Sequence, residues 1–138
     1  MVIIKEIVFP TSGHSEVVKI TDKIETLLGE SSLKRGMVLL FVPGNTATVT
    51  TLEFEPGLVA DLKKAWERLV PEREEYEHNL RWGDGNGYAH VRSSFAGPSL
   101  VVPFEDGKLL LGTWQDIVLV DFDNRPRERR LIVQLWGE

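Results

Sequence analysis

The sequence predicts a single α+β domain over residues 1–138, in which β-sandwich-like sheets outnumber two to three helices. The length suits one domain, because domains cluster near ~100–150 residues. Short apolar or alternating segments bounded by Gly, Pro, Asn and Asp recur along the chain, which is typical of strands and turns. Only a few segments carry apolar residues at helical spacing, and no repeat or linker divides the chain.

The first thirty residues predict two strands and a short helix. Positions 2–9 alternate so that both faces carry mostly apolar residues, which indicates a strand largely covered on both faces. We expect positions 15–20 to form its hairpin partner. Thr21 is a suitable cap for the following helix, and Gly29 a suitable end, because a left-handed residue usually closes a helix.

The middle of the chain predicts two further strands and an amphipathic helix. Positions 37–42 are continuously apolar and positions 46–52 are rich in β-branched residues. Because Pro43-Gly44-Asn45 separates them, they are expected to form a central hairpin or neighbouring strands. The next helix ends before Pro71, and its Trp66 is expected in the core.

The last third predicts antiparallel strands joined by turns. The expected strands are residues 100–104, 109–113, 117–122 and 131–136. The arginine-rich run 125–130 is expected to solvate a hairpin end. The acidic stretch 71–78 lacks an apolar period, which predicts a solvated loop.

Composition excludes several classes of function. The net charge of −5 offers no broad basic face, so we expect no nucleic-acid partner. The absence of cysteine excludes disulfides, thiolate zinc sites and cysteine nucleophiles, which leaves histidine and carboxylate to hold any metal. No leader-like start or membrane-length apolar run occurs, so we expect a cytoplasmic protein without membrane contact.

The stretch from Trp82 to Ser94 carries the strongest functional signal. Glycines at every second position lead into a segment with one histidine and two serines. Glycine permits close backbone approach to a ligand, and amides at a helix start attract anions, so a phosphate or metal site is expected. If a helix begins around Tyr88, then His90, Ser93 and Ser94 share one side. The alternative is a tight turn capped by Asn86 or Asp84.

A pair of histidines brackets this loop. His78 and His90 lie twelve positions apart, so an excursion of the chain can bring both imidazoles together. Two histidines hold a metal weakly, and Glu53, Asp84 or water are candidates for a third ligand. The alternative is an exposed His78 and a His90 that only forms hydrogen bonds near a helix start. The glycine spacing does not match a dinucleotide fingerprint.

Three motifs resemble those of the YjbQ family: Ala89-His90-Val91-Arg92-Ser93-Ser94, Gly97-Pro98-Ser99 and Gly112-Thr113-Trp114-Gln115. The resemblance covers essentially the whole chain. It implies a homotrimer and a weak thiamine-phosphate synthase activity, which joins a pyrimidine methyl pyrophosphate to a thiazole phosphate and releases pyrophosphate. It also implies a divalent ion, Mg or Zn, that polarises the leaving pyrophosphate, with Arg92 or Arg81 taking part of the charge.

Together, the motifs and the resemblance define the expected site. The expected catalytic residues are His90, Ser93 and Gln115; the phosphate- or substrate-binding residues are Gly85, Asn86, Gly87, Arg92, Ser94, Thr113 and Trp114; and the metal ligands are His78, His90 and Glu53. One departure matters: Gly44 stands where many family members have a histidine, so a three-histidine metal centre does not follow. Two other interpretations remain open, a noncatalytic homotrimeric module that binds a small anion or metal, and a cluster that only builds a trimer interface.

Overall fold

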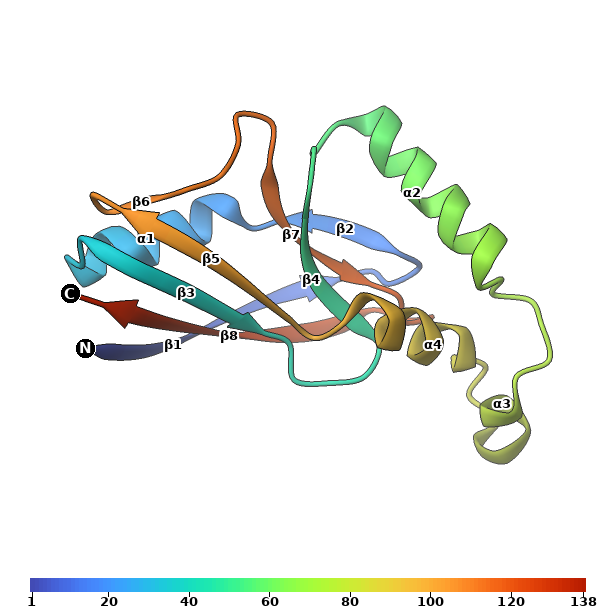
Figure 1. The fold of residues 1–138 in the computed structure, drawn as a ribbon. Helices are drawn as coiled ribbons and strands as arrows, with labels where there is room; N and C mark the ends of the chain where they lie inside the picture. Colours follow the sequence, from blue (N-terminus) through green and yellow to red (C-terminus); the bar gives the residue numbers. More distant parts are fainter.

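Two antiparallel sheets and four helices make up the computed structural model, which describes residues 1–138 (Figure 1). The strands are β1 (Val2–Thr11), β2 (Glu16–Lys19), β3 (Arg35–Phe41), β4 (Ala47–Leu52), β5 (Ser99–Glu105), β6 (Lys108–Leu109), β7 (Asp116–Asp121) and β8 (Arg127–Gly137). The helices are α1 (Thr21–Ser31), α2 (Pro56–Leu69), α3 (Glu77–Trp82) and α4 (Gly87–Ala96). The predicted α+β class with two facing sheets is therefore confirmed, with four helices where two to three were expected.

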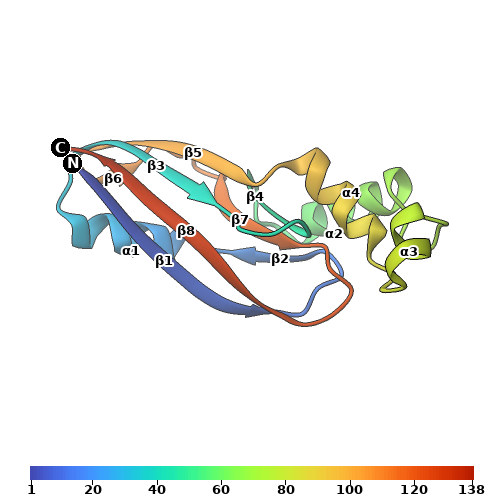
Figure 2. The same ribbon diagram turned by 90° about the horizontal axis from the view of Figure 1, so that it is seen from below.

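The five-stranded sheet has the order β1-β8-β3-β5-β6 and the three-stranded sheet the order β2-β7-β4. The first strand pairs with the last, with Val2 opposite Trp136, and the two chain ends lie side by side (Figure 2). The expected hairpin between the first strand and residues 15–20 is wrong, since β2 pairs with β7 in the other sheet. Alternation identifies a strand but carries no information about a partner far away in sequence.

The expected hairpin of residues 37–42 and 46–52 is also wrong. Strand β3 pairs with β8 and β5, whereas β4 pairs with β7 across the core. Gly44 has φ of 129°, a conformation that favours glycine, and the segment around it carries the chain from one sheet to the other. The expected strand 109–113 shortens to β6, because the chain leaves the sheet after Leu109.

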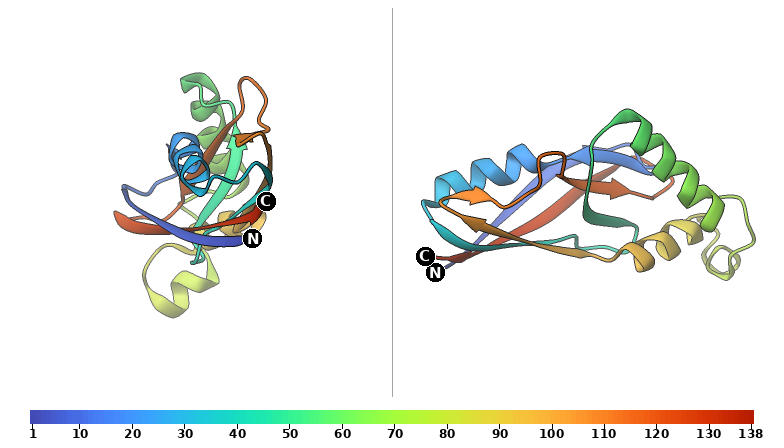
Figure 3. Two further views of the ribbon diagram at one scale, coloured as in Figure 1. Left: turned by 90° about the vertical axis from the view of Figure 1, so that its left-hand side faces the viewer. Right: turned by 45° about the horizontal axis from the view of Figure 1, so that its top comes forward.

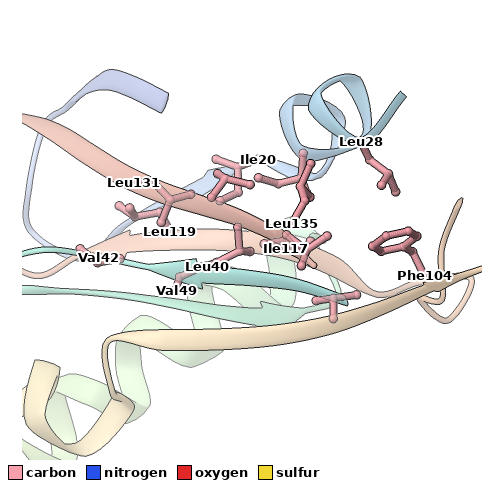
Figure 4. Packing of buried hydrophobic residues seen from close by; sticks show 14 of the residues in the cluster. Ile20, Leu28, Leu40, Val42, Val49, Phe104, Ile117, Leu119, Leu131 and Leu135 are labelled. Carbon is pink, nitrogen blue, oxygen red and sulfur yellow. The ribbon is translucent and has the colours of Figure 1, made fainter. Parts of the chain in front are cut away.

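The main core fills the space between the two sheets and α1 (Figure 4). Its members come from inward positions of the strands and from one face of α1, including Leu40, Leu119 and Leu28. Helix α1 continues past Gly29 to Ser31, and Ser32 adopts the left-handed conformation instead. The Thr21 hydroxyl does not cap this helix: it donates to Asp116 and accepts from the backbone of Ile117, which ties α1 to β7.

A smaller core joins α2, α4 and Tyr76, the residue before α3, to β7 at the end away from the chain termini (Figure 3). Trp66 packs edge-on against Phe122 with ring centroids 5.2 Å apart, which confirms its predicted core position. The end of the expected acidic loop forms α3, whose first residue is Glu77. None of the four helices is long and apolar enough to cross a membrane.

Candidate functional site

His78 and His90 contact each other where α3 and α4 meet. Their ring centroids are 4.4 Å apart, and the ring planes are tilted by 37°. His78 is the second residue of α3 and His90 the fourth residue of α4, so each side chain projects from a helix near its start. The loop between the helices therefore brings the two imidazoles together, as the sequence predicts.

The glycines set this geometry in two ways. Gly83 and Gly85 have φ near 70°, which lets the chain reverse between the helices. At Gly87 a Cβ atom would lie 2.7 Å from Cβ of Tyr76, so only glycine allows α4 to start this close to α3. The Gly87 amide donates to Oδ1 of Asn79 at 2.8 Å, which joins the two helices directly.

Three buried polar atoms of α3, of α4 and of the residue before α4 have no hydrogen-bond partner. The buried side-chain atoms without a hydrogen-bond partner are His78 Nδ1, Asn86 Oδ1 and Tyr88 Oη, and all belong to α3, α4 or the residue before α4. His78 Nδ1 lies 3.4 Å from Asp84 Oδ1, but the two atoms are not aligned for a hydrogen bond. Native proteins pair nearly all buried polar atoms, so His78 Nδ1 and Asn86 Oδ1 are available to a water molecule or a ligand.

The pKa of His90 lies below its ordinary value. Burial is the main cause, and the neighbouring His78 adds to it, while Asp123 and Asp84 act in the opposite direction. The lowered pKa favours a neutral His90 ring at pH 7. A neutral imidazole has a lone pair that can accept a proton or bind a cation.

A buried carboxylate network, which the sequence did not predict, supports the site from the β7–β8 turn. Asn86 Nδ2 donates to Asp123 Oδ1 at 3.2 Å, and Thr46 and Arg127 donate to Oδ2. Burial raises the pKa of Asp123, but hydrogen bonds from Asn124, Asn86 and Thr46 outweigh burial, so the pKa lies below its usual value. This ionised carboxylate fixes Asn86 beside the histidine pair.

The same network contains a buried ion pair between Arg129 and Asp121. The guanidinium donates to both carboxylate oxygens at 2.7 and 2.8 Å, and it also reaches the Thr46 hydroxyl. Arg129 is only 3% exposed, so the expectation that the whole run 125–130 is solvated is wrong at this position. The alternation of β8 could have predicted the burial of Arg129, because Arg129 shares a side of the strand with the inward apolar residues Leu131 and Val133.

Arg92 lies away from the expected phosphate site. Its side chain is buried, with 2% exposed, and donates to the Val70 carbonyl, Ser15 and Glu67. Its guanidinium also stacks on the Tyr88 ring at 4.9 Å. These hydrogen bonds anchor α4, so the structure places the Arg92 guanidinium among protein groups and not at the expected phosphate site.

The two serines after His90 differ in their placement. The Ser93 hydroxyl is buried and donates to the Ala47 carbonyl at 2.9 Å, so it faces β4 instead of the histidine pair. The structure therefore does not bring the Ser93 hydroxyl, which the sequence predicts to be catalytic, to the histidine pair. The Ser94 hydroxyl bonds back to the His90 carbonyl, and Ser94, His90, Val91 and Phe95 line an open hollow on the outer side of α4.

The remaining expected residues lie at the other end of the three-stranded sheet. Gln115 donates to Thr51 and accepts from the Gly112 amide, and Glu53 directly follows β4 at the same end. Along β4 and β7 this end is five residues from the Ala47–Asp121 pair, which corresponds to roughly 17 Å. Within one chain the structure therefore does not bring Gln115, Thr113, Trp114 or Glu53 to the histidine pair.

The metal set proposed from the sequence is consequently incomplete in a single chain. No three side chains of His, Cys, Asp or Glu are arranged to hold an ion. The glycine loop does bring Gly85, Asn86 and Gly87 to the histidine pair, and the free atoms there are His78 Nδ1 and Asn86 Oδ1. The Asp84 carboxylate beside His78 is the nearest charged group.

Comparisons with known proteins agree with this fold. Residues 5–138 match the model of the family described as UPF0047 protein YjbQ-like. A UPF0047 protein of Archaeoglobus fulgidus is 40% identical over 129 residues, which is 94% of this chain and 98% of that protein. YugU of Bacillus subtilis is 34% identical over 136 residues, covering 97% and 99% of the two chains.

Solved structures show the same architecture. A YbjQ-like protein of unknown function from Sulfolobus solfataricus superposes with a TM-score of 0.90 at 34% identity, with all of both chains covered. An uncharacterised YjbQ/UPF0047 protein from Clostridium acetobutylicum gives a TM-score of 0.88 at 32% identity, covering 96% of this chain and 99% of that one. The chain therefore belongs to the YjbQ/UPF0047 family.

Proposed function

We propose that this chain is a small-molecule phosphate-binding enzyme of the thiamine-phosphate synthase kind, acting in the cytoplasm as a homotrimer. The observation that carries the proposal is the His78–His90 contact, in which the buried Nδ1 of His78 has no hydrogen-bond partner. The histidine contact lies near the start of α4, the end of the helix whose dipole favours negatively charged oxygen. A phosphorylated substrate and a cation together satisfy both features.

The residues at the histidine pair fit a divalent ion in part. His78 Nδ1 and Asn86 Oδ1 are free lone-pair donors, and Asp84 adds a nearby carboxylate. Nitrogen and oxygen ligands of this kind suit Zn, and oxygen ligands suit Mg. When bound, such an ion polarises the leaving pyrophosphate.

The reaction joins two substrates without a redox change. A bond forms between the thiazole nitrogen and the pyrimidine methyl carbon, while the bond from that carbon to the pyrophosphate oxygen breaks. The electron pair of the broken bond leaves with pyrophosphate. His90, kept neutral by its surroundings, binds and orients the substrate through its lone pair, and the turn at Gly85, with φ near 70°, lets the backbone approach the phosphate.

The test is a reaction of metal-free protein reloaded with Mg or Zn and given both precursors. Product and released pyrophosphate should appear together with wild-type protein and fall at least tenfold in His90→Ala. His14→Ala is the matched control, because His14 is an exposed histidine whose contact is with Glu72. If wild-type protein never forms more product than His90→Ala, the proposed enzymatic activity is contradicted.

A noncatalytic module that holds a metal or small anion is the second candidate. One observation favours it: both buried arginines of this end are already paired with carboxylates of the protein, Arg92 with Glu67 and Arg129 with Asp121, which reduces the charge that they can offer to a leaving group. In this case calorimetry should detect Zn binding that His78→Ala abolishes, while no turnover accompanies it.

A further inference from the structure

A cleft lies between α2 and the side of the three-stranded sheet that faces away from the main core. Its volume is about 340 Å³, and its walls come from β4, α2 and α4, with one residue of β7. In Figure 1, α2 slopes away from β4, while α4 lies at the foot of that strand. The strand contributes Thr50 and Leu52, and the helices contribute Leu62, Trp66 and Phe95. A volume of this size is typical of sites for small molecules.

Side-chain contacts hold α2 mainly at its C-terminal end. There Arg92 donates to the Val70 carbonyl and to Glu67, and Trp66 packs against Phe122. The first half of α2 makes no side-chain hydrogen bond or ion pair with the sheet, and no residue of the helix is buried. The apolar sides of the helix and of the sheet therefore face each other without closing on each other.

The lining of the cleft defines the charge of a ligand. None of the nine residues that line it is charged, and six of them are hydrophobic. A charged ligand would lose its water here without gaining an opposite charge in exchange. Trp66 lines one wall, and the Phe95 ring at the rim is 77% exposed, so both aromatic side chains can pack against a ring. The cleft therefore suits an uncharged aromatic molecule.

The polar residues of the cleft are three threonines of β4, and their hydroxyls differ in what they contact. The Thr48 hydroxyl donates to the Gly97 carbonyl at 2.6 Å, and the Thr51 hydroxyl accepts from Gln115 at 3.1 Å. The Thr50 hydroxyl has no partner in the protein, and the residue is half-buried in the cleft wall. It can accept or donate a hydrogen bond to a ligand.

We infer that the cleft between α2 and β4 binds a small, uncharged aromatic molecule whose single hydrogen-bonding group contacts Thr50. A helix of another protein does not fit, because one helical turn about 10 Å across and about 5.4 Å long fills roughly 400 Å³. His90 does not line the cleft, so this site is separate from the histidine pair. The inference goes beyond the proposed function and does not depend on it.

The test is a titration of the full chain with indole, an uncharged aromatic molecule with one N–H group, followed by NMR of the backbone amides. Indole should bind with a dissociation constant of about 1 mM or below, and the largest shifts should fall in β4 and α2. Thr50→Phe fills the cleft and should weaken binding at least tenfold. Val101→Phe is the matched control, because it adds the same ring at an exposed position of β5 outside the cleft.

A second variant, Thr50→Val, tests the hydrogen bond without changing the shape of the cleft. It should weaken the binding of indole about fivefold, because the N–H group loses its acceptor. It should leave the binding of 1-methylindole unchanged, because this ligand has no N–H group. The two ligands keep the inference testable if Thr50→Phe does not fold.

The outcomes decide between occupants of the cleft. Indole that does not bind wild-type protein, shifts that lie outside the cleft, or equal binding by Thr50→Phe and Val101→Phe would overturn the inference. Equal effects of Thr50→Val on both ligands would overturn the contact with Thr50. Signals of the cleft that change with protein concentration but not with indole would assign it to a second copy of the chain. His90→Ala should bind indole as wild-type protein does, which separates this site from the proposed reaction.

Discussion

The two ends of the three-stranded sheet differ in how their polar groups are held. At the end near α4, Asp121 and Asp123 are fully buried and bonded to arginine, threonine and asparagine side chains. At the other end, Gln115 and Trp114 lie in an open loop, with Trp114 74% exposed. Both ends carry family motifs, but only the first has an internal framework that fixes its side chains.

This difference indicates what each end contributes. Buried, charge-assisted hydrogen bonds hold their atoms in place, so the histidine end is organised before any ligand arrives. At the loop end, the Gln115 side chain makes one hydrogen bond to Thr51 and one to the Gly112 backbone amide, and both are at the surface. We therefore expect substitutions at the first end to affect folding and binding together, and those at the second to leave folding nearly unchanged.

The largest effect is expected at the buried ion pair. Arg129→Ala should lower the free energy of unfolding by about 3–5 kcal/mol, because it leaves the Asp121 carboxylate buried without its partner. Gln115→Ala should lower it by less than about 1 kcal/mol, because its hydrogen bonds are exposed. Urea unfolding of both variants measures the contrast, and equal losses would remove the distinction between the ends.

A second comparison uses one glycine from each end. Gly87→Ala should cost about 1–3 kcal/mol and separate α4 from α3, because its Cβ atom would meet Tyr76 at 2.7 Å. Gly112→Ala should change stability little, since its nearest contact is with a flexible side-chain oxygen at 3.6 Å. Thermal unfolding gives the stability, and NMR of the histidine rings shows whether their contact is lost. A Gly87→Ala variant as stable as Gly112→Ala would contradict the proposed role of close helix contact.

The sequence predicts the local elements better than their partners. Alternation and apolar runs locate β1, β3, β7 and β8, since they reflect burial of each strand by itself. They do not predict that β3 and β4 enter different sheets, because partner choice depends on contacts distant along the chain. The contact of His78 with His90 is predictable because a short glycine loop limits how far apart they can lie.

The supporting residues of the site were harder to predict. Asp121, Asp123 and Arg129 come from the β7–β8 region, and charged residues near a turn usually lie in water. Their partners come from distant parts of the chain: Thr11 on β1 and Arg129 on β8 both donate to Asp121. Arg92 is the opposite case: its place in a site motif predicts contact with a ligand, whereas its hydrogen bonds in the structure anchor α4.

The smallest expected effect is a pH dependence confined to the histidine end. The pKa of His90 is lowered in the folded protein, mainly by burial, so the unfolded chain binds its proton more readily. The contribution of His90 to stability is therefore complete above its ordinary pKa of 6.5, and it is lost as the pH falls through the lower pKa that His90 has in the folded protein. Urea midpoints at pH 8 and pH 5.5 should show a drop in wild-type protein that is smaller in His90→Gln. His14→Gln should retain the full drop, because His14 lies on the surface beside Glu72. If His90→Gln also retained the full drop, the titrating group would lie elsewhere, and burial of the histidine pair would not distinguish this end of the sheet from the other.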